Sequence, residues 1–192
     1  MRRLLPVYAI LLLACREAPF EPDGTGKFSA AYIAQNRGTL AFEIPEAYEL
    51  TNVVILLSRY DVNGYQGNFA NDPYARAVRQ VFGAYRSHPA VTRTSDRIRT
   101  VNDNYNLRDN AYRYAFDAGD NLVETGIYGR FYRDDYFEEF RGDLQDFSAK
   151  SGFRRFFAAH QPFYDSLKAV QAVQMPVRRM QAWLEARFPD RY

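Results

Sequence analysis

The sequence has one cysteine, two histidines and no apolar run long enough to cross a membrane as a helix. Because Cys15 is the only cysteine in 192 residues, no disulfide can form within the chain, and stability must come from a packed core. The longest apolar run, Leu4–Leu13, is roughly half the length that spans a bilayer. These absences exclude a disulfide scaffold and a permanent helical anchor at the N-terminus.

The chain also lacks an excess of charge once its first residues are set aside. It has 25 Lys and Arg against 23 Asp and Glu, and the difference is carried by Arg2 and Arg3. An even balance gives no net attraction to phosphate backbones or anionic lipids. We therefore expect no nucleic-acid partner.

The N-terminus has the layout of a bacterial export signal. Two arginines precede the apolar run, which ends at Leu12-Leu13-Ala14-Cys15. These four residues resemble the lipobox of bacterial lipoproteins, in which the cysteine becomes the acylated N-terminus. The sequence thus predicts a signal peptide over 1–14, cleavage between Ala14 and Cys15, and a palmitate-type lipid on Cys15. The protein would be exported and anchored to a membrane of the bacterial cell envelope; an ordinary cleaved signal with an incidental cysteine is the alternative.

A short tether and one domain are expected after the signal. Residues 15–26 contain two prolines and two glycines, which is typical of a flexible linker. Residues 27–192 are long enough for a single domain with its own core, and the 15 Tyr and 15 Phe supply material for it.

Two stretches favour antiparallel β-hairpins. Residues 27–35 and 39–44 are strand-like and flank a turn at Asn36-Arg37-Gly38. Residues 111–116 and 122–128 flank a second turn rich in aspartate and glycine.

The rest of the N-terminal half predicts helices opened by prolines. Pro45 opens a helix that is apolar on nearly all sides through Leu57, so we expect it to be the most buried. Pro73, with Asp72 as its cap, starts a second helix that ends before His88-Pro89. The polar stretch from 91 to 110 is expected to be irregular.

The C-terminal half shows apolar residues at helical spacing. Residues 136–147 predict one helix and 153–157 a short one ending near His160. A long apolar stripe follows over 163–188 and is broken by Pro176. The predicted fold class is α+β, mainly α: a helical domain with one or two short antiparallel β-hairpins.

No complete catalytic or metal-binding motif is present in the sequence. His88 and His160 have no second ligand at metal-binding spacing, and a structural role at helix C-termini is expected for both. The pairs Asp134-Asp135 and Glu138-Glu139 have the residue types of a glycosidase. The nearby Arg130, Arg133 and Arg141 favour an ion-paired, solvated face instead. We therefore predict no catalytic residue, no metal and no cofactor.

An aromatic cluster is the candidate contact surface of the chain. Tyr128, Tyr132, Tyr136 and Phe137 lie close together in the sequence and are of the type that stacks on sugars or anchors protein partners. The alternative is that these rings belong to the core. A glycan or protein partner would therefore bind this cluster only if its rings are exposed.

Three segments resemble a family of bacterial lipoproteins catalogued only as a domain of unknown function. The segments are Glu43–Val54, Tyr74–Pro89 and the C-terminal Phe188–Tyr192. The resemblance implies a relation to gluzincin-type zinc metallopeptidases, with zinc expected only in full-length relatives. It implies that this chain corresponds to the N-terminal, non-catalytic part of such a protein, either as a truncated portion or as a self-contained one. Peptidase activity would then require a further C-terminal segment, and the alternative function is an envelope binding module.

Overall fold

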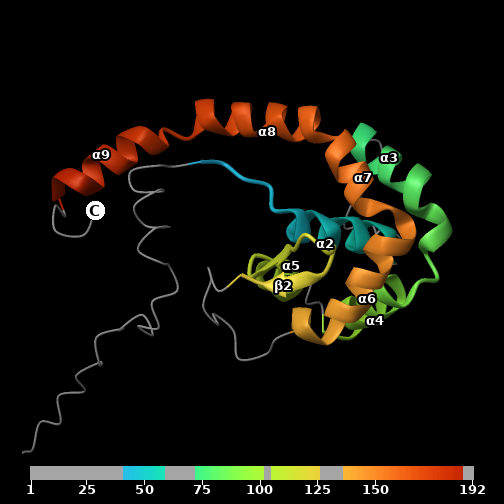
Figure 1. The fold of residues 1–192 in the computed structure, drawn as a ribbon. Helices are drawn as coiled ribbons and strands as arrows, with labels where there is room; N and C mark the ends of the chain where they lie inside the picture. The colour runs from blue at the N-terminus through green and yellow to red at the C-terminus, as the bar shows by residue number, and fades with distance from the viewer. Residues whose placement is uncertain (1–40, 59–71, 102–104, 126–135, 188–192) are drawn as a thin grey trace, which may run out of the picture.

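The structure is a computed structural model and describes residues 41–58, 72–101, 105–125 and 136–187. These residues form eight α-helices and one antiparallel hairpin, which confirms the predicted mainly helical α+β class (Figure 1). The elements in chain order are α2 (Glu46–Leu57), α3 (Pro73–Phe82), the 3₁₀ turn η2 (Gly83–Tyr85), α4 (Pro89–Val101), α5 (Tyr105–Ala111), β1 (Tyr114–Phe116), β2 (Leu122–Glu124), α6 (Tyr136–Ser151), α7 (Phe153–Ala159), α8 (Gln161–Gln174) and α9 (Val177–Arg187).

Helix α2 lies at the centre of the domain, as its sequence predicts. It packs against α3, α4, α5, α6, α7 and β1, so apolar residues are needed on almost every side. Its buried apolar residues are Ala47, Leu50, Val53, Val54, Ile55 and Leu57. The helix begins one residue after Pro45, and Glu46 and Glu49 occupy its first turn, where negative charge is favourable.

Helix α3 begins where the sequence predicts and is capped by the expected residue. One carboxylate oxygen of Asp72 accepts hydrogen bonds from the backbone N–H of Tyr74 at 2.8 Å and of Ala75 at 3.1 Å. Pro73 fills the first helical position, which needs no N–H donor. The cap fixes the first turn of α3, and with it the position of the Tyr74 side chain.

The expectation of irregular structure over 91–110 is wrong, because α4 and α5 occupy most of it. Val91, Thr94 and Ile98 are buried along one side of α4, although polar residues surround them in the sequence. Three or four buried residues on a helix of this length are enough to fix it against a core. The sequence did not predict α4 because its buried residues form only a narrow stripe on a mostly polar helix.

The second predicted hairpin is confirmed, with shorter strands. Strands β1 and β2 pair with Tyr114 opposite Glu124 and Phe116 opposite Leu122. Asp117 closes the loop, since its side chain accepts hydrogen bonds from the backbone N–H of Gly119 at 2.8 Å and Asn121 at 2.9 Å. Residues 126–128 of the prediction lie outside the described residues.

The first predicted hairpin is not seen in the part of it that is described. Residues 41–45 contain no strand, and the rest of the hairpin, with the signal peptide, Ala14, Cys15 and the tether, lies outside the described residues. The prediction for residues 27–40 is therefore neither confirmed nor contradicted.

The C-terminal helices leave the core progressively. Gly152 ends α6 in a left-handed conformation with φ of 71°, and its N–H donates to the carbonyl of Ser148 at 3.1 Å. Helix α8 runs from the end of α7 along one edge of the domain, and α9 continues beyond the other helices (Figure 1). The break at Pro176 is confirmed, but of these two helices only Tyr164 is buried. Within the four described ranges, no helix is long and apolar enough to cross a membrane.

Candidate functional site

A buried carboxylate marks the most distinctive site of the domain. Glu49 lies on α2 and is only 6% exposed, among the apolar residues of the core. Burial raises its pKa above the ordinary value, and hydrogen bonds from Tyr74 and Asn52 and the nearby His160 partly oppose this effect. A carboxylate is rarely placed in such surroundings without partners or a role.

Glu49 is held in a chain of side-chain hydrogen bonds that joins three helices. The Tyr74 hydroxyl, from α3, donates to one carboxylate oxygen of Glu49, and Asn52 donates its amide to the other at 3.2 Å. The Tyr74 and Tyr164 hydroxyl oxygens lie 2.7 Å apart. Because the Tyr74 proton is used by Glu49, Tyr164 is the donor in this second bond. Burial and the carboxylate both raise the pKa of Tyr74, so the phenol keeps its proton.

Aromatic rings surround this hydrogen-bond chain. The Tyr74 ring stacks on Phe163, with centroids 4.9 Å apart and planes inclined by 12°. The Tyr164 and His160 rings meet Tyr74 edge-on. Offset stacks and edge-to-face pairs are the preferred arrangements of such rings. The stack fixes α8 against α3 and holds the Tyr74 hydroxyl over Glu49.

His160 packs edge-on against the Tyr74 ring, with centroids 5.7 Å apart. Its Nδ1 lies 2.8 Å from the carbonyl oxygen of Phe156, so Nδ1 carries the proton in this bond. His160 follows the last residue of α7, and its backbone N–H also bonds to that helix. The predicted position at a helix C-terminus is confirmed for this histidine.

A cavity of about 360 Å³ opens beside the Glu49 carboxylate. Its described lining combines the polar cluster with apolar side chains from the N-terminal segment and from α2, α3 and α8. The lining residues are Ile44, Glu49, Asn52, Ile55, Leu56, Asp72, Tyr74, Ala75, Arg108, Phe163, Tyr164 and Leu167. A mostly apolar cavity with a few converging polar groups is the usual form of a small-ligand site.

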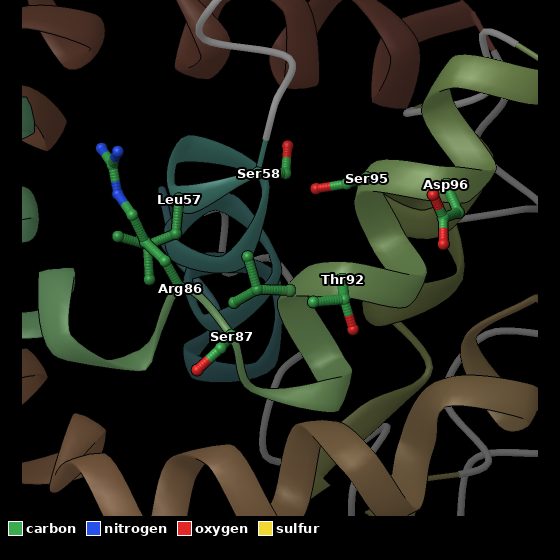
Figure 2. Close-up of a pocket in the computed structure, with 8 residues that line it drawn as sticks. Leu57, Ser58, Arg86, Ser87, Thr92, Ser95 and Asp96 are labelled. Carbon is green, nitrogen blue, oxygen red and sulfur yellow. The ribbon is translucent and has the colours of Figure 1, made fainter.

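A second, larger cavity of about 660 Å³ lies between the end of α2 and α4 (Figure 2). Its polar side chains point in several directions, and three of them bond to groups close to them in the chain. Ser58 donates to the carbonyl of Ile55 at 2.7 Å, Thr92 bonds to carbonyls of the preceding turn, and Asp96 pairs with Arg99. No buried charge faces this space among the described residues that line it. The smaller cavity is therefore the better candidate site.

His88 has a structural role at a helix end, but at the opposite end from the one predicted. Its Nδ1 accepts the backbone N–H of Ala90 at 3.2 Å at the start of α4, and its Nε2 lies 3.0 Å from Asp146. Lys150 and His88 hold the pKa of Asp146 below its usual range. Because Nδ1 accepts this hydrogen bond, the ring caps the N-terminus of α4 rather than the C-terminus of the preceding helix.

The aromatic cluster predicted as a contact surface is only partly described, and part of it is in the core. Phe137 is fully buried and its ring stacks on that of Tyr114, with centroids 4.4 Å apart, so for this residue the alternative of a core position holds. The guanidinium of Arg97 covers the half-buried Tyr136 ring at 3.4 Å. Tyr128 and Tyr132 lie outside the described residues. The sequence left both alternatives open because apolar rings on the buried and exposed sides of a helix look alike in sequence.

Of the acidic pair on α6, Glu138 forms an ion pair, as expected, and Glu139 is exposed. Glu138 accepts hydrogen bonds from Tyr114 and from Arg141, whose guanidinium lies 2.9 Å from its carboxylate. The other predicted pair, Asp134-Asp135, lies outside the described residues. Within the described ranges, no three His, Cys, Asp or Glu side chains are grouped in a way that could hold a metal ion.

Comparison with known proteins finds no relative of this chain. No family model matches the chain, and neither the curated proteins nor the solved structures give a match. The resemblance of the three segments to a lipoprotein family of unknown function therefore stays a prediction.

Glu49→Gln is expected to stabilise the domain at neutral pH. Because the pKa of Glu49 is higher in the folded than in the unfolded chain, folding favours its protonated form, and its contribution to stability falls as pH rises above about 4.5. Glutamine can still accept the Tyr74 hydroxyl without burying a charge, so we expect a gain of about 1–2 kcal/mol at pH 7. Urea unfolding of both proteins at pH 4 and pH 7 measures this.

The gain should shrink towards zero at pH 4, where wild-type Glu49 is largely protonated. A variant that is less stable than the wild type at pH 7 would show that the charged carboxylate stabilises the fold. Glu139→Gln, at an exposed position on α6, is the control and should change little at either pH.

Proposed function

We propose that this protein is a lipid-anchored envelope protein whose helical domain binds a small ligand in the cavity beside Glu49. The observation that carries the binding role is a buried carboxylate that borders a cavity otherwise lined largely by apolar and aromatic side chains. The location rests on the N-terminal sequence, where a short apolar leader ends at a lipobox-like Cys15.

Binding is favoured over catalysis by the chemistry of the cavity lining. As far as it is described, the lining offers carboxylate, amide, phenol and guanidinium groups, with no serine, cysteine or histidine. Both oxygens of Glu49 accept hydrogen bonds from fixed side chains, which suits recognition better than proton transfer. If the chain is related to the metallopeptidase-like lipoproteins, the domain would be their non-catalytic part.

The anchor is tested by labelling cells with radioactive palmitate. We expect the wild-type protein to incorporate label and to sediment with membranes. A lipoprotein carries several acyl chains, and each buried methylene contributes about 0.8 kcal/mol to membrane attachment. Cys15→Ala should lose both properties. Label that persists in this variant would exclude lipidation at Cys15.

The binding role is tested with a neutral apolar probe, phenylbutanol, on the mature chain carrying Cys15→Ala. NMR titration should show saturable shifts of backbone amides in α2, α3 and α8. Leu56→Trp should weaken binding at least about tenfold, because the larger side chain would fill a cavity that Leu56 lines. Val81→Trp is the matched control at an exposed position outside the lining and should bind normally.

A further inference from the structure

We infer that the ligand of this cavity carries a protonated amine that pairs with Glu49, attached to an apolar or aromatic body. This inference rests on the proposed binding function and adds the chemical class of the ligand. Three features of the cavity support it: the free acceptor capacity of Glu49, the character of the remaining lining, and the balance of charge.

Glu49 has acceptor capacity beyond its two side-chain partners. An ionised carboxylate has about four lone-pair sites, and Tyr74 and Asn52 occupy one on each oxygen. A ligand that approaches from the cavity satisfies the remaining sites only if it brings donors. An ammonium group brings three donors and a positive charge, which makes it the best match for a carboxylate away from water.

The rest of the lining suits the body of such a ligand. Tyr74, Phe163 and Tyr164 present aromatic rings, which bind cations and flat groups well. Ile44, Ile55, Leu56 and Leu167 complete the apolar side of the cavity. The lining therefore fits an aralkyl or alkyl amine better than a fully polar ligand such as a sugar.

The described lining of the cavity has more acidic than basic residues. Glu49 and Asp72 are acidic, and Arg108 is the basic residue of the described lining. The Arg108 guanidinium lies over the Tyr105 ring at 5.7 Å and takes part in other contacts. His160 lies behind Tyr74 and is outside the lining, and the phenols of Tyr74 and Tyr164 keep their protons because burial raises the pKa of each.

Asp72 is less available than Glu49 for a ligand. One of its oxygens caps α3 through two backbone N–H groups, and the start of the helix offsets its charge. Glu49 is thus the group that a ligand cation meets with the strongest attraction.

The test compares three probes that share one body: phenylbutylammonium, phenylbutanol and phenylbutanoate. Dissociation constants are measured by NMR at pH 7 on the mature chain carrying Cys15→Ala. We expect the ammonium to bind at least about tenfold more tightly than the alcohol, and the carboxylate to bind most weakly. Adding Glu49→Gln should reduce the affinity for the ammonium to about that for the alcohol. Glu139→Gln should leave all three constants unchanged.

The outcomes separate this inference from the proposed function. If the alcohol and the ammonium bind equally well, the cavity binds ligands but the amine is not recognised, and the inference is overturned. If the carboxylate binds best, Arg108 is the anchoring group and the inference is likewise overturned. If none of the probes binds, the proposed function itself fails.

Discussion

Replacing Phe82 with alanine is expected to lower the free energy of unfolding by about 4 kcal/mol, as for other large-to-small changes at fully buried rings. Phe82 is fully buried at the end of α3. Its ring lies 4.8 Å from that of Phe156, 5.9 Å from Phe147 and 6.4 Å from Phe153, so it joins α3 to α6 and α7. The substitution removes all three ring contacts and leaves a cavity that rigid neighbours cannot fill.

Val81→Ala is the matched control for this experiment. Val81 precedes Phe82 on the same helix but is 47% exposed, so the expected change is within about 0.5 kcal/mol. Urea or guanidinium unfolding, followed by far-UV circular dichroism, gives both values. Similar losses in the two variants would contradict the assignment of Phe82 to the core. Since domains of this size are stable by about 5–15 kcal/mol, Phe82→Ala should still fold at low temperature.

The helices that sequence analysis predicts well are those with a local signal. Helix α2 is apolar on nearly all sides, and α3 carries a proline and an aspartate cap at its start. Both features act within a few residues of where they stand. Helix α4 has a mostly polar sequence, and only contact with the core distinguishes its buried side from its exposed side.

Burial along the chain was harder to predict than helical structure. The apolar spacing that puts Phe137 in the core is similar to the spacing that leaves Val173, Met180 and Trp183 exposed on α8 and α9. Periodicity identifies a helix and its apolar side, but not whether another element covers that side. The structure shows that α8 and α9 leave the body of the domain, which local sequence does not reveal.

The candidate site could not be predicted, because it is assembled from distant parts of the chain. Tyr74 lies 25 residues from Glu49 and 90 residues from Tyr164. The one sequence feature that pointed to the site was Glu49 itself, a glutamate within the first turn of a helix that is apolar on nearly all sides. Such a position also fits an ordinary interaction with the helix dipole. Only the packing of α3 against α2, and of Tyr164 against Tyr74, distinguishes a buried, hydrogen-bonded carboxylate from an exposed one.

Tyr74→Phe is expected to destabilise the domain by about 2 kcal/mol at pH 7, because one hydroxyl serves two buried partners. Its loss leaves a Glu49 oxygen without its donor and the Tyr164 hydroxyl without its acceptor. The ring stays in place, so the stack on Phe163 is kept and the effect reports the hydrogen bonds. Tyr85→Phe, which removes one exposed hydrogen bond to the carbonyl of Lys150, should cost less than about 1 kcal/mol.

A double-mutant cycle with Glu49→Gln tests whether the loss comes from the carboxylate. If the Tyr74 hydroxyl stabilises mainly a charged Glu49, removing it from the Glu49→Gln protein should cost at least about 0.5 kcal/mol less than removing it from the wild type. The loss should also shrink as pH falls towards 4, because a protonated carboxyl needs the donor less than a charged one. Additive effects at every pH would show that the hydroxyl and the carboxylate are energetically independent.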